Sequence, residues 1–421
     1  MSAPGMLIVG SSQAGVQLAV SLRALGYADP VTLLGDEDHR PYQRPALSKE
    51  FLQDAVGKES LIFRSAEYWR DNGIDVVKGH RIDTVATRAD GSGLATARDG
   101  REFSFDRLAL TVGARARRLS VPGADLDGVL YLRTADDALA LKARVPEVRR
   151  AVVIGGGFIG LETAASLHTL GIEVTVIEFA DRLVARAVGA ATSDFLFRHH
   201  TDAGIDIRLG TAVEQVVGRD GQVSGVIAGG VEIPADVVLV GIGVIPNTAL
   251  AEQMGLAVDD GIVVDDHAVT SDGHTLAVGD CANLPDPSPG APAGRRVRFE
   301  SVNHAIEQAK VAAYAAVGRS QEYASVPWFW STQGVLKLQI AGVSGGHDTV
   351  VDRSAPDPRK HSVLYYRGDR LVAAECVNTP LDFIAVKKAL AQQISLPPAT
   401  VTDPATPLSA VLAAASGRKA S

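Results

Sequence analysis

A glycine-rich turn between two strand-like runs constrains the fold of this chain more than any other feature. Residues Ala151–Ile154 form an apolar run, Gly155–Gly160 follow it, residues 161–170 have a helical pattern, and Glu173–Ile177 form a second strand-like run. The order strand, turn, helix, strand is that of a βαβ unit in a parallel sheet. Glycines at the first, third and sixth positions of the turn let a pyrophosphate approach the backbone at a helix N-terminus. We therefore expect a dinucleotide site here.

An acidic residue after the second run suggests which nucleotide binds. Glu178 follows that run directly, where a carboxylate can accept a hydrogen bond from a ribose 2'-hydroxyl and repel a 2'-phosphate. This placement favours NADH over NADPH, although Arg182 and Arg186 follow closely and leave the preference open. The alternative is a purely structural glycine-rich turn, which the complete order of strand, turn, helix and acid disfavours.

The same pattern occurs in a weaker form near the N-terminus. The runs are Met6–Val9, residues 16–25 and Val31–Leu34, which predict a strand, a helix and a strand. Gly10 and Gly15 keep the first and third glycines of the turn, whereas Ser12 replaces the second. Because a serine side chain is small, we expect a slightly displaced phosphate and a second dinucleotide site.

Asp36 lies at the end of the second N-terminal strand, where a carboxylate can bind an adenosine ribose. Glu37 and Asp38 are its neighbours, so a solvated acidic loop is the alternative interpretation. Two nucleotide sites in one chain suggest a flavoprotein that binds FAD first and a nicotinamide nucleotide second.

Composition excludes several functional classes. The chain has 421 residues, which predicts two or three domains, and a net charge of −8, which argues against nucleic-acid binding. No apolar run is long enough to cross a bilayer and no signal peptide is evident, so we expect a cytoplasmic protein. The only cysteines, Cys281 and Cys376, have no CxxC spacing. The lack of a dithiol argues against disulfide reductases, and the lack of an early cysteine argues against peroxide and oxygen reductases that use one.

The rest of the chain fits an α/β fold with an added C-terminal part. Strand-like runs end in glycine-containing turns near residues 108–112, 237–240 and 275–278, as in a doubly wound parallel sheet. Residues 284–294 predict an exposed loop, and alternating strands such as Ser362–Tyr366 begin after about Tyr323. The tail from Pro397 predicts a loosely held segment.

Further segments resemble the FAD-dependent NADH:ferredoxin reductases of the putidaredoxin and rhodocoxin reductase type, which serve cytochrome P450s or ring-hydroxylating dioxygenases. The segments are Arg40–Lys49, Thr111–Ala114, Gly241–Asn247, Val278–Cys281, Glu300–Ala305 and Trp328–Ser331. Three positions depart from the family's usual pattern: Ala46, Thr111–Gly113 and Ser331–Gly334. The last departure leaves the identity of the ferredoxin more open than the chemistry.

This resemblance implies a glutathione-reductase-like α/β fold with two Rossmann-type domains and a C-terminal α+β domain. The implied bounds are 1–112 and 244–322 for the FAD domain, 113–243 for the NAD domain, and 323–421 for the interface domain. The expected FAD contacts are Gly10, Ser12, Ala14, Gly15, Asp36, Arg44, Lys49, Ile82, Thr111, Gly113, Arg133, Asp280, Val302 and Trp330. The expected NAD contacts are Gly155, Gly157, Phe158, Ile159, Gly160, Glu162, Glu178 and Gly243.

The resemblance also implies an activity: NADH gives hydride to FAD, which passes single electrons to a 2Fe-2S ferredoxin. Glu162 and Lys49 are the expected catalytic pair, although a favourable charge at a helix N-terminus is the alternative for Glu162. Trp328 and Trp330 could shield the flavin or only pack between domains. Possible contributors to a basic docking patch are Arg295, Arg296, Arg298, Lys387 and Lys388, or these form a solvated surface.

Other functional classes remain as alternatives. A thiol-free NADH oxidase or quinone reductase would have the same motifs, and so would a redox signalling protein like apoptosis-inducing factor. The ten histidines show no metal-ligand or triad spacing, so no metal is expected, and His199–His200 predict a helix surface. We expect a monomer or a weak homodimer.

Overall fold

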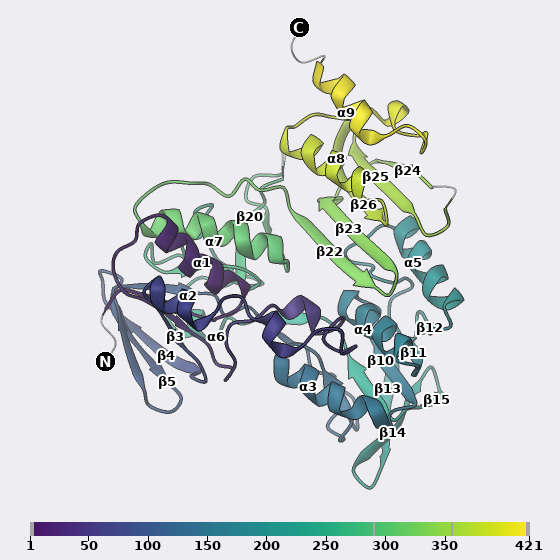
Figure 1. Cartoon of the computed structure of the whole chain (residues 1–421), viewed down its shortest axis with the longest axis horizontal. Coiled ribbons are helices and arrows are strands. Elements are labelled where there is room, and N and C mark those ends of the chain that lie inside the picture. The colour runs from purple at the N-terminus through teal and green to yellow at the C-terminus, as the bar shows by residue number, and fades with distance from the viewer. Residues whose placement is uncertain (1–3, 289–290, 355–356, 418–421) are drawn as a thin grey trace. The chain divides into compact units, whose positions relative to one another are not determined.

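The computed structural model describes residues 4–288, 291–354 and 357–417 of the chain (Figure 1). The chain divides into two compact units, each built from three separate segments. The first unit comprises Met1–Arg44, Lys58–Arg115 and Val244–Ser325, and the second comprises Pro45–Gly57, Ala116–Gly243 and Val326–Ser421. Each unit contains one of the two predicted parallel sheets.

The main sheet of the first unit has the strand order β19-β7-β1-β2-β3, and all its strands are parallel. The strands are β1 (Met6–Val9), β2 (Val31–Leu34), β3 (Ile74–Val77), β7 (Arg107–Leu110) and β19 (Leu276–Ala277). Helices α1 (Gln13–Ala24) and α7 (Val302–Ala316) pack against each other and share one core with Ile8 and Leu33. The turn before α1 therefore lies at the carboxyl ends of the strands, where nucleotides bind in such folds.

Smaller elements complete this unit. They are α2 (Ala66–Asp71), α6 (Ala249–Gln253), the antiparallel sheet of β4 (Ile82–Thr87), β5 (Gly93–Ala97) and β6 (Glu102–Phe105), the strands β18 (Ile262–Val263), β20 (Ala282–Pro285) and β21 (Arg296–Val297), and the short helix η2 (Lys58–Leu61). The short helix η1 (Arg44–Ala46) begins at the last residue of this unit's first segment and continues into the second unit. Strands β8 (Ala114–Ala116) and β17 (Val244–Pro246) pair as a two-stranded sheet.

The second unit contains a parallel sheet of order β12-β11-β10-β16-β9. Its strands are β9 (Val129–Tyr131), β10 (Arg150–Ile154), β11 (Glu173–Ile177), β12 (Asp206–Arg208) and β16 (Val237–Val240). The associated helices are α3 (Ala135–Arg144), η3 (Val145–Glu147), α4 (Phe158–Thr169) and α5 (Ala190–Asp202), and β13 (Val213–Arg219), β14 (Gln222–Ala228) and β15 (Val231–Pro234) form an antiparallel sheet.

An antiparallel sheet of order β22-β23-β26-β25-β24 follows in the same unit. Its strands are β22 (Trp328–Gln333), β23 (Leu336–Gly342), β24 (Thr349–Asp352), β25 (His361–Arg367) and β26 (Arg370–Val377), and the helices after it are α8 (Pro380–Ala391), η4 (Pro398–Thr400) and α9 (Leu408–Gly417). Leu336 and Leu338 of β23 share a core with Leu161 of α4. This antiparallel sheet therefore packs against α4, a helix of the parallel sheet in the same unit.

The fold class predicted from the sequence is confirmed, but three local predictions are wrong. Residues 398–417 of the predicted tail are not loosely held, because Val401, Leu408 and Leu412 are buried in one core with α8, whereas residues 418–421 lie outside the described part of the chain. Residues 284–285 belong to β20 rather than to a loop, whereas residues 289–290 of that predicted loop lie outside the described part of the chain. Helices α1 and α4 begin at Gln13 and Phe158, earlier than the predicted residues 16 and 161.

A buried carboxyl in the antiparallel sheet leads to a stability prediction. Glu375 of β26 is 1% exposed, and its Oε1 accepts a hydrogen bond of 2.9 Å from the Gly189 backbone N–H. The hydroxyls of Thr192 and Tyr365 are its other buried polar neighbours. Burial therefore raises the pKa of the Glu375 carboxyl above its ordinary value.

We expect Glu375→Gln to make the protein more stable above neutral pH. A raised pKa in the folded state means that stability falls as the pH rises from the unfolded-chain pKa toward the folded-state pKa. The neutral amide lacks this loss, so the variant should gain about 1–2 kcal/mol in unfolding free energy at pH 8 and little at pH 4. Urea unfolding at both pH values measures the difference, and an equal change at both would contradict the assignment.

Candidate functional site

The first glycine turn accepts only glycine at its ends. Gly10 has φ +117°, and a Cβ on it would lie 2.2 Å from the Thr111 carbonyl oxygen. A Cβ on Gly15 would lie 2.0 Å from the Gly10 carbonyl oxygen. The turn is thus pressed against residues that follow β7, which explains why these two fingerprint glycines are kept.

Ser12 occupies the N-cap of α1 but does not cap it. Its hydroxyl accepts a hydrogen bond of 3.2 Å from Arg44 Nε, and the side chain makes no cap bond to the first turn of the helix. The first N–H groups of a helix need an acceptor, and an anion at the positive end of the helix supplies one. This arrangement fits a pyrophosphate, with Arg44 beside it.

Of the acidic residues after β2, Glu37 has a contact with Arg44 that the sequence did not predict. Asp36 is exposed, whereas half-buried Glu37 accepts hydrogen bonds from Tyr42 Oη at 2.6 Å and Arg44 Nη2 at 2.5 Å. Glu37 therefore positions Arg44 and is not part of a solvated loop. Sequence reasoning missed it because three adjacent acids offer no signal that separates the inward one from its neighbours.

Several predicted FAD contacts come together at the carboxyl ends of β1, β7 and β19. The residues in the first unit are Gly10, Ser12, Ala14, Gly15, Asp36, Arg44, Ile82, Thr111, Gly113, Asp280 and Val302. Thr111 lies against Gly10 and Gly15, and a Cβ on Gly279, next to Asp280, would lie 3.1 Å from Ala14 Cβ. Ile82 is buried at the start of β4, and Val302 begins α7. Lys49, Arg133 and Trp330 belong to the second unit.

The second glycine turn has the same form with a more open centre. Gly155 has φ +108°, and a Cβ on it would lie 2.4 Å from the Gly241 carbonyl oxygen. Gly160 is equally tight, since its Cβ would lie 2.0 Å from the Gly155 carbonyl oxygen. Gly157 is the uncapped N-cap of α4, and nothing lies within 4 Å of a Cβ built on it. This open cradle before a helix N-terminus fits the pyrophosphate of a nicotinamide nucleotide.

Glu178 is fixed at the edge of this cradle. Its Oε2 accepts a hydrogen bond of 2.6 Å from the Gly156 N–H, and its Oε1 accepts one of 2.7 Å from the Ala180 N–H. Arg182 donates to the carbonyl oxygens of Val188 and Ala185 at 2.7 and 2.6 Å. The Arg182 guanidinium is thus held by the backbone, which weakens the case for its binding a 2'-phosphate.

The other predicted NAD contacts occupy varied surroundings. The Phe158 ring packs against Phe329, with 4.5 Å between centroids, while Ile159 is 45% exposed. A Cβ on Gly243 would lie 3.1 Å from Arg186 Nη2, so Arg186 borders the loop between β16 and β17. Phe179, which the sequence analysis did not single out, follows Glu178 and is 80% exposed. Its exposure, unusual for a phenylalanine, is visible only in the structure and not in the sequence.

Lys49 and Glu162 meet in a buried polar cluster of the second unit. Lys49 Nζ lies 2.6 Å from Glu162 Oε2, and the two side chains are only 11% and 3% exposed. Ser48 Oγ donates to the same carboxylate oxygen at 2.6 Å, and Ser331 Oγ donates to Oε1 at 2.8 Å. Sequence reasoning did not predict the two serines, which come from a loop and from β22. A buried charge pair with such satisfied neighbours is typical of functional sites.

The predicted basic docking patch is not supported for its arginines. Arg295 pairs with Asp286 at 3.1 Å, and Arg298 pairs with Glu300 at 2.7 Å. Arg296 donates to the carbonyl oxygens of Val264 and Asn283. Arg295 and Arg298 are therefore compensated by nearby carboxylates, and Arg296 is held by the backbone. Lys387 Nζ, on α8, lies 4.4 Å from the centroid of the Trp328 ring. The Trp328 ring stacks on that of Trp330, with 5.4 Å between their centroids.

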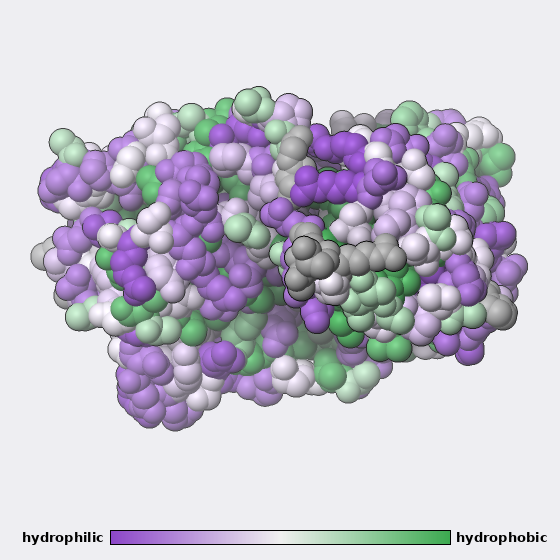
Figure 2. Space-filling model, turned by 90° about the horizontal axis from the view of Figure 1, so that it is seen from above, coloured by the Kyte–Doolittle hydropathy of each residue, from purple (hydrophilic) through white to green (hydrophobic). Residues whose placement is uncertain are grey.

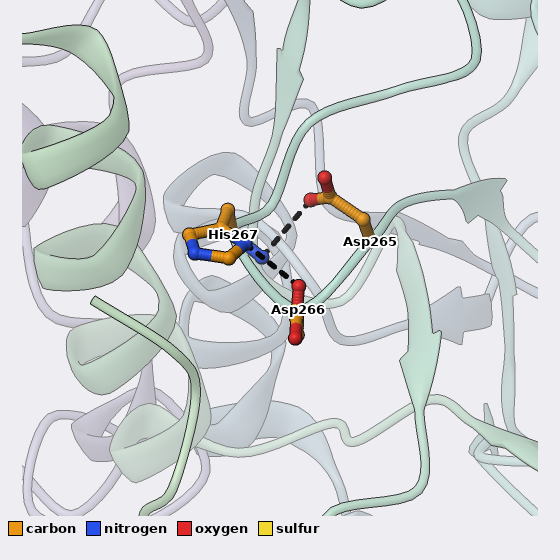
Figure 3. Close-up of side chains that lie close together, drawn as sticks. All are labelled: Asp265, Asp266 and His267. Atoms are coloured by element: carbon orange, nitrogen blue, oxygen red, sulfur yellow. Dashed lines mark hydrogen bonds and ion pairs between the residues drawn. The ribbon is translucent and has the colours of Figure 1, made fainter. Parts of the chain in front are cut away.

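Figure 3 shows a group of three residues whose ligand atoms lie close enough for a metal, but which have local partners. His267 Nδ1 lies 2.7 Å from Asp266 Oδ1, and His267 Nε2 lies 2.9 Å from Ser320 Oγ. Asp265 Oδ1 accepts hydrogen bonds from the N–H groups of His267 and Val269. These contacts are those of a capped turn, so the group carries no metal assignment.

Both cysteines are free and buried. Burial raises the pKa of Cys281 to about 11 and that of Cys376 to about 12, which keeps both as unreactive thiols. We expect Ellman's reagent at pH 8 to modify the native protein slowly and to titrate two thiols in guanidinium chloride. Rapid reaction of the native protein would show that a thiol is accessible and would contradict this prediction.

No helix in the described ranges is long and apolar enough to cross a membrane, and hydrophilic residues cover much of the face in Figure 2.

Comparisons with known proteins agree with this geometry. Residues 5–309 match the pyridine nucleotide-disulphide oxidoreductase family, and residues 328–412 match the reductase C-terminal family. Rhodocoxin reductase of Rhodococcus erythropolis is 43% identical over 94% of this chain and 92% of its own length. Putidaredoxin reductase of Pseudomonas putida is 36% identical over 97% of both chains.

Solved structures give the same result. The ferredoxin reductase for the CYP199A2 system of Rhodopseudomonas palustris has a TM-score of 0.91 and 38% identity, covering 97% of this chain and all of that one. Putidaredoxin reductase in its covalent complex with putidaredoxin has a TM-score of 0.91 and 35% identity, covering 99% and 100%. The chain therefore belongs to the pyridine nucleotide-disulphide oxidoreductase family, within its group of FAD-dependent ferredoxin reductases.

Proposed function

We propose that this protein oxidises NADH with a bound FAD and delivers single electrons to a 2Fe-2S ferredoxin that feeds a cytochrome P450 or a ring-hydroxylating dioxygenase. The observation that carries the proposal is the pair of uncapped glycine turns, one in each unit, in a chain whose two thiols are buried. Two nucleotides without a reactive cysteine suit electron transfer rather than thiol chemistry.

The residues divide into three groups by the task we assign them. The turn at Gly10–Gly15, with Arg44 beside it, would hold FAD in the domain formed by residues 1–112 and 244–322. The turn at Gly155–Gly160, with Glu178, would hold NADH in residues 113–243, and residues 323–421 would form the interface domain. Bound FAD would supply the chemistry that accepts hydride and releases electrons one at a time.

Lys49 and Glu162 are the pair that we expect to act at the reacting nucleotide. Glu162 lies in the first turns of α4, directly after the NADH cradle, and its charge is balanced by Lys49. Their contribution would be to position the nicotinamide, because hydride transfer depends on close approach and orientation. We further propose that the protein is a cytoplasmic monomer or weak homodimer, since NADH and its soluble acceptors are found in the cytoplasm.

Anaerobic titration of the purified protein tests the proposal. We expect NADH to bleach a yellow chromophore, NADPH to do so far less readily because Glu178 opposes a 2'-phosphate, and a 2Fe-2S ferredoxin to be reduced faster than oxygen. An absent flavin would overturn the proposal. So would a flavin that NADH reduces but that passes no electrons to ferredoxin, which would favour an oxidase, a quinone reductase or a signalling protein.

A further inference from the structure

The Glu162 carboxylate is the end point of a longer chain of buried hydrogen bonds. Ser331 and Gln333 lie two residues apart on β22, so their side chains point to the same face of the strand. Gln333 Nε2 donates to Ser331 Oγ at 3.1 Å, and Ser331 Oγ donates to Glu162 Oε1 at 2.8 Å. Gln333 Oε1 in turn lies 2.8 Å from His200 Nε2, on α5.

All four side chains in this series of hydrogen bonds are buried. Glu162 is 3%, Gln333 2% and His200 2% exposed, and Ser331 is fully buried. The expectation that His199–His200 form a helix surface is therefore wrong for His200. Burial also lowers the pKa of the His200 imidazole, which keeps it neutral at physiological pH. A buried network of this kind is costly unless each group has its partner, so its members must be satisfied together.

The direction of the hydrogen bonds is the same at each step. The carboxamide oxygen of Gln333 can only accept, so His200 must carry its proton on Nε2. The carboxamide nitrogen can only donate, which leaves the Ser331 hydroxyl proton for Glu162. The donors thus run from His200 to the carboxylate, which receives Ser48 and Lys49 on its other oxygen.

We propose that Ser331, Gln333 and His200 are positioning residues that hold the Glu162 carboxylate in a fixed orientation against Lys49. This inference rests on the proposed oxidation of NADH, in which Glu162 acts at the nucleotide. With Oε1 held by Ser331, the carboxylate cannot rotate away from Lys49 when a nucleotide enters the cradle. The chain of donors makes one rotamer of Glu162 the resting state, so less reorganisation is needed before hydride transfer.

The first experiment compares variants of the complete, flavin-containing protein by anaerobic stopped flow with NADH alone. Ser331→Ala should slow flavin bleaching at saturating NADH roughly tenfold while the Kd for NADH changes less than about twofold. Ser331→Thr keeps the hydroxyl and should recover most of the rate. Ser193→Ala is the matched control, because Ser193 is a buried serine of the same unit that donates to the Leu183 carbonyl oxygen instead.

Several outcomes of this comparison would overturn the proposal. They are a Ser331→Ala protein that reacts like the parent, equal losses in Ser331→Ala and Ser193→Ala, and a threonine variant no faster than the alanine variant. Because ferredoxin is left out, failure to reduce ferredoxin would count against the proposed function without affecting this test.

A second measurement needs no turnover. With 15N-labelled histidine, the imidazole of His200 should show the Nε2–H tautomer and should stay neutral when the exposed histidines titrate. Gln333→Leu should abolish that signature by removing its acceptor. A His200 resonance with the proton on Nδ1, or one that titrates with the exposed histidines, would overturn the donor chain even if NADH failed to reduce the flavin.

Discussion

Replacing Lys49 by methionine is expected to lower the free energy of unfolding by about 3–5 kcal/mol, because Glu162 would remain as a buried charge without its cation. The two side chains are 11% and 3% exposed, and their atoms lie 2.6 Å apart, so water cannot replace the ammonium group. Chemical denaturation at pH 7 measures the loss. The flavin of any folded variant should be reduced by NADH at least tenfold more slowly than that of the parent.

Two further variants separate stability from catalysis. The double variant Lys49→Met/Glu162→Gln has no unpaired charge and should recover most of the stability, but not the rate of reduction. Lys78→Met is the matched control, because Lys78 forms an exposed pair with Asp38 at 2.8 Å and should change stability by less than about 1 kcal/mol. A Lys49→Met protein as stable as Lys78→Met would contradict the first prediction.

Glu162→Ala tests the catalytic interpretation alone. If this variant kept the parent's rate of reduction and affinity for NADH and lost only thermal stability, Glu162 would be a structural charge at a helix N-terminus rather than part of the active site.

Gly10→Ala is expected to give a protein that no longer retains FAD. The substitution demands φ near +117°, which side-chain-bearing residues avoid, and places a methyl group 2.2 Å from the Thr111 carbonyl oxygen. The strand end, the turn and the start of α1 must then separate, and this is the surface that we assign to the pyrophosphate. The ratio of flavin to protein absorbance after purification gives the result directly.

Gly157→Ala is the control for this prediction. Gly157 has φ −81° and open space around its Cβ position, so alanine fits the fold without strain. Its methyl group would instead occupy the cradle for the nicotinamide nucleotide. We expect normal flavin content with a Kd for NADH raised roughly tenfold. A Gly10→Ala protein with the parent's flavin content would show that the N-terminal turn is not the FAD site.

Most of the fold could be predicted because its strands are short apolar runs bounded by glycine. Met6–Val9, Val31–Leu34, Glu173–Ile177 and Val237–Val240 have the predicted bounds. The helix starts were placed late because the last residues of each glycine turn already have helical geometry. The sequence could not show that residues 398–417 are held in a core, because their burial depends on α8 rather than on their own periodicity.

The site was less predictable for a related reason. The fingerprints locate a backbone turn, but a side-chain cluster depends on which distant segments meet. Ser331 and Gln333 join Glu162 only because β22 packs against α4 and α5. Glu37 and His200 are each of the same residue type, acidic or histidine, as an adjacent residue. Only the direction of each side chain, toward the interior of the protein, sets it apart. Patterns of residue type report periodicity and spacing, not the partner that each side chain finds.

The division of the chain into interleaved segments has a consequence for its synthesis. The first unit needs β19, at residues 276–277, beside β7, and its last segment ends at Ser325. The sheet of the first unit cannot be completed during translation until β19 has been synthesised and can pair with β7. Residues 116–243 form a continuous stretch with all five strands of their own parallel sheet, so they can fold first. Nascent chains arrested near residue 285, which leave β16 outside and β19 inside the ribosomal exit tunnel, should therefore protect the second parallel sheet from protease while the N-terminal strands remain open to cleavage.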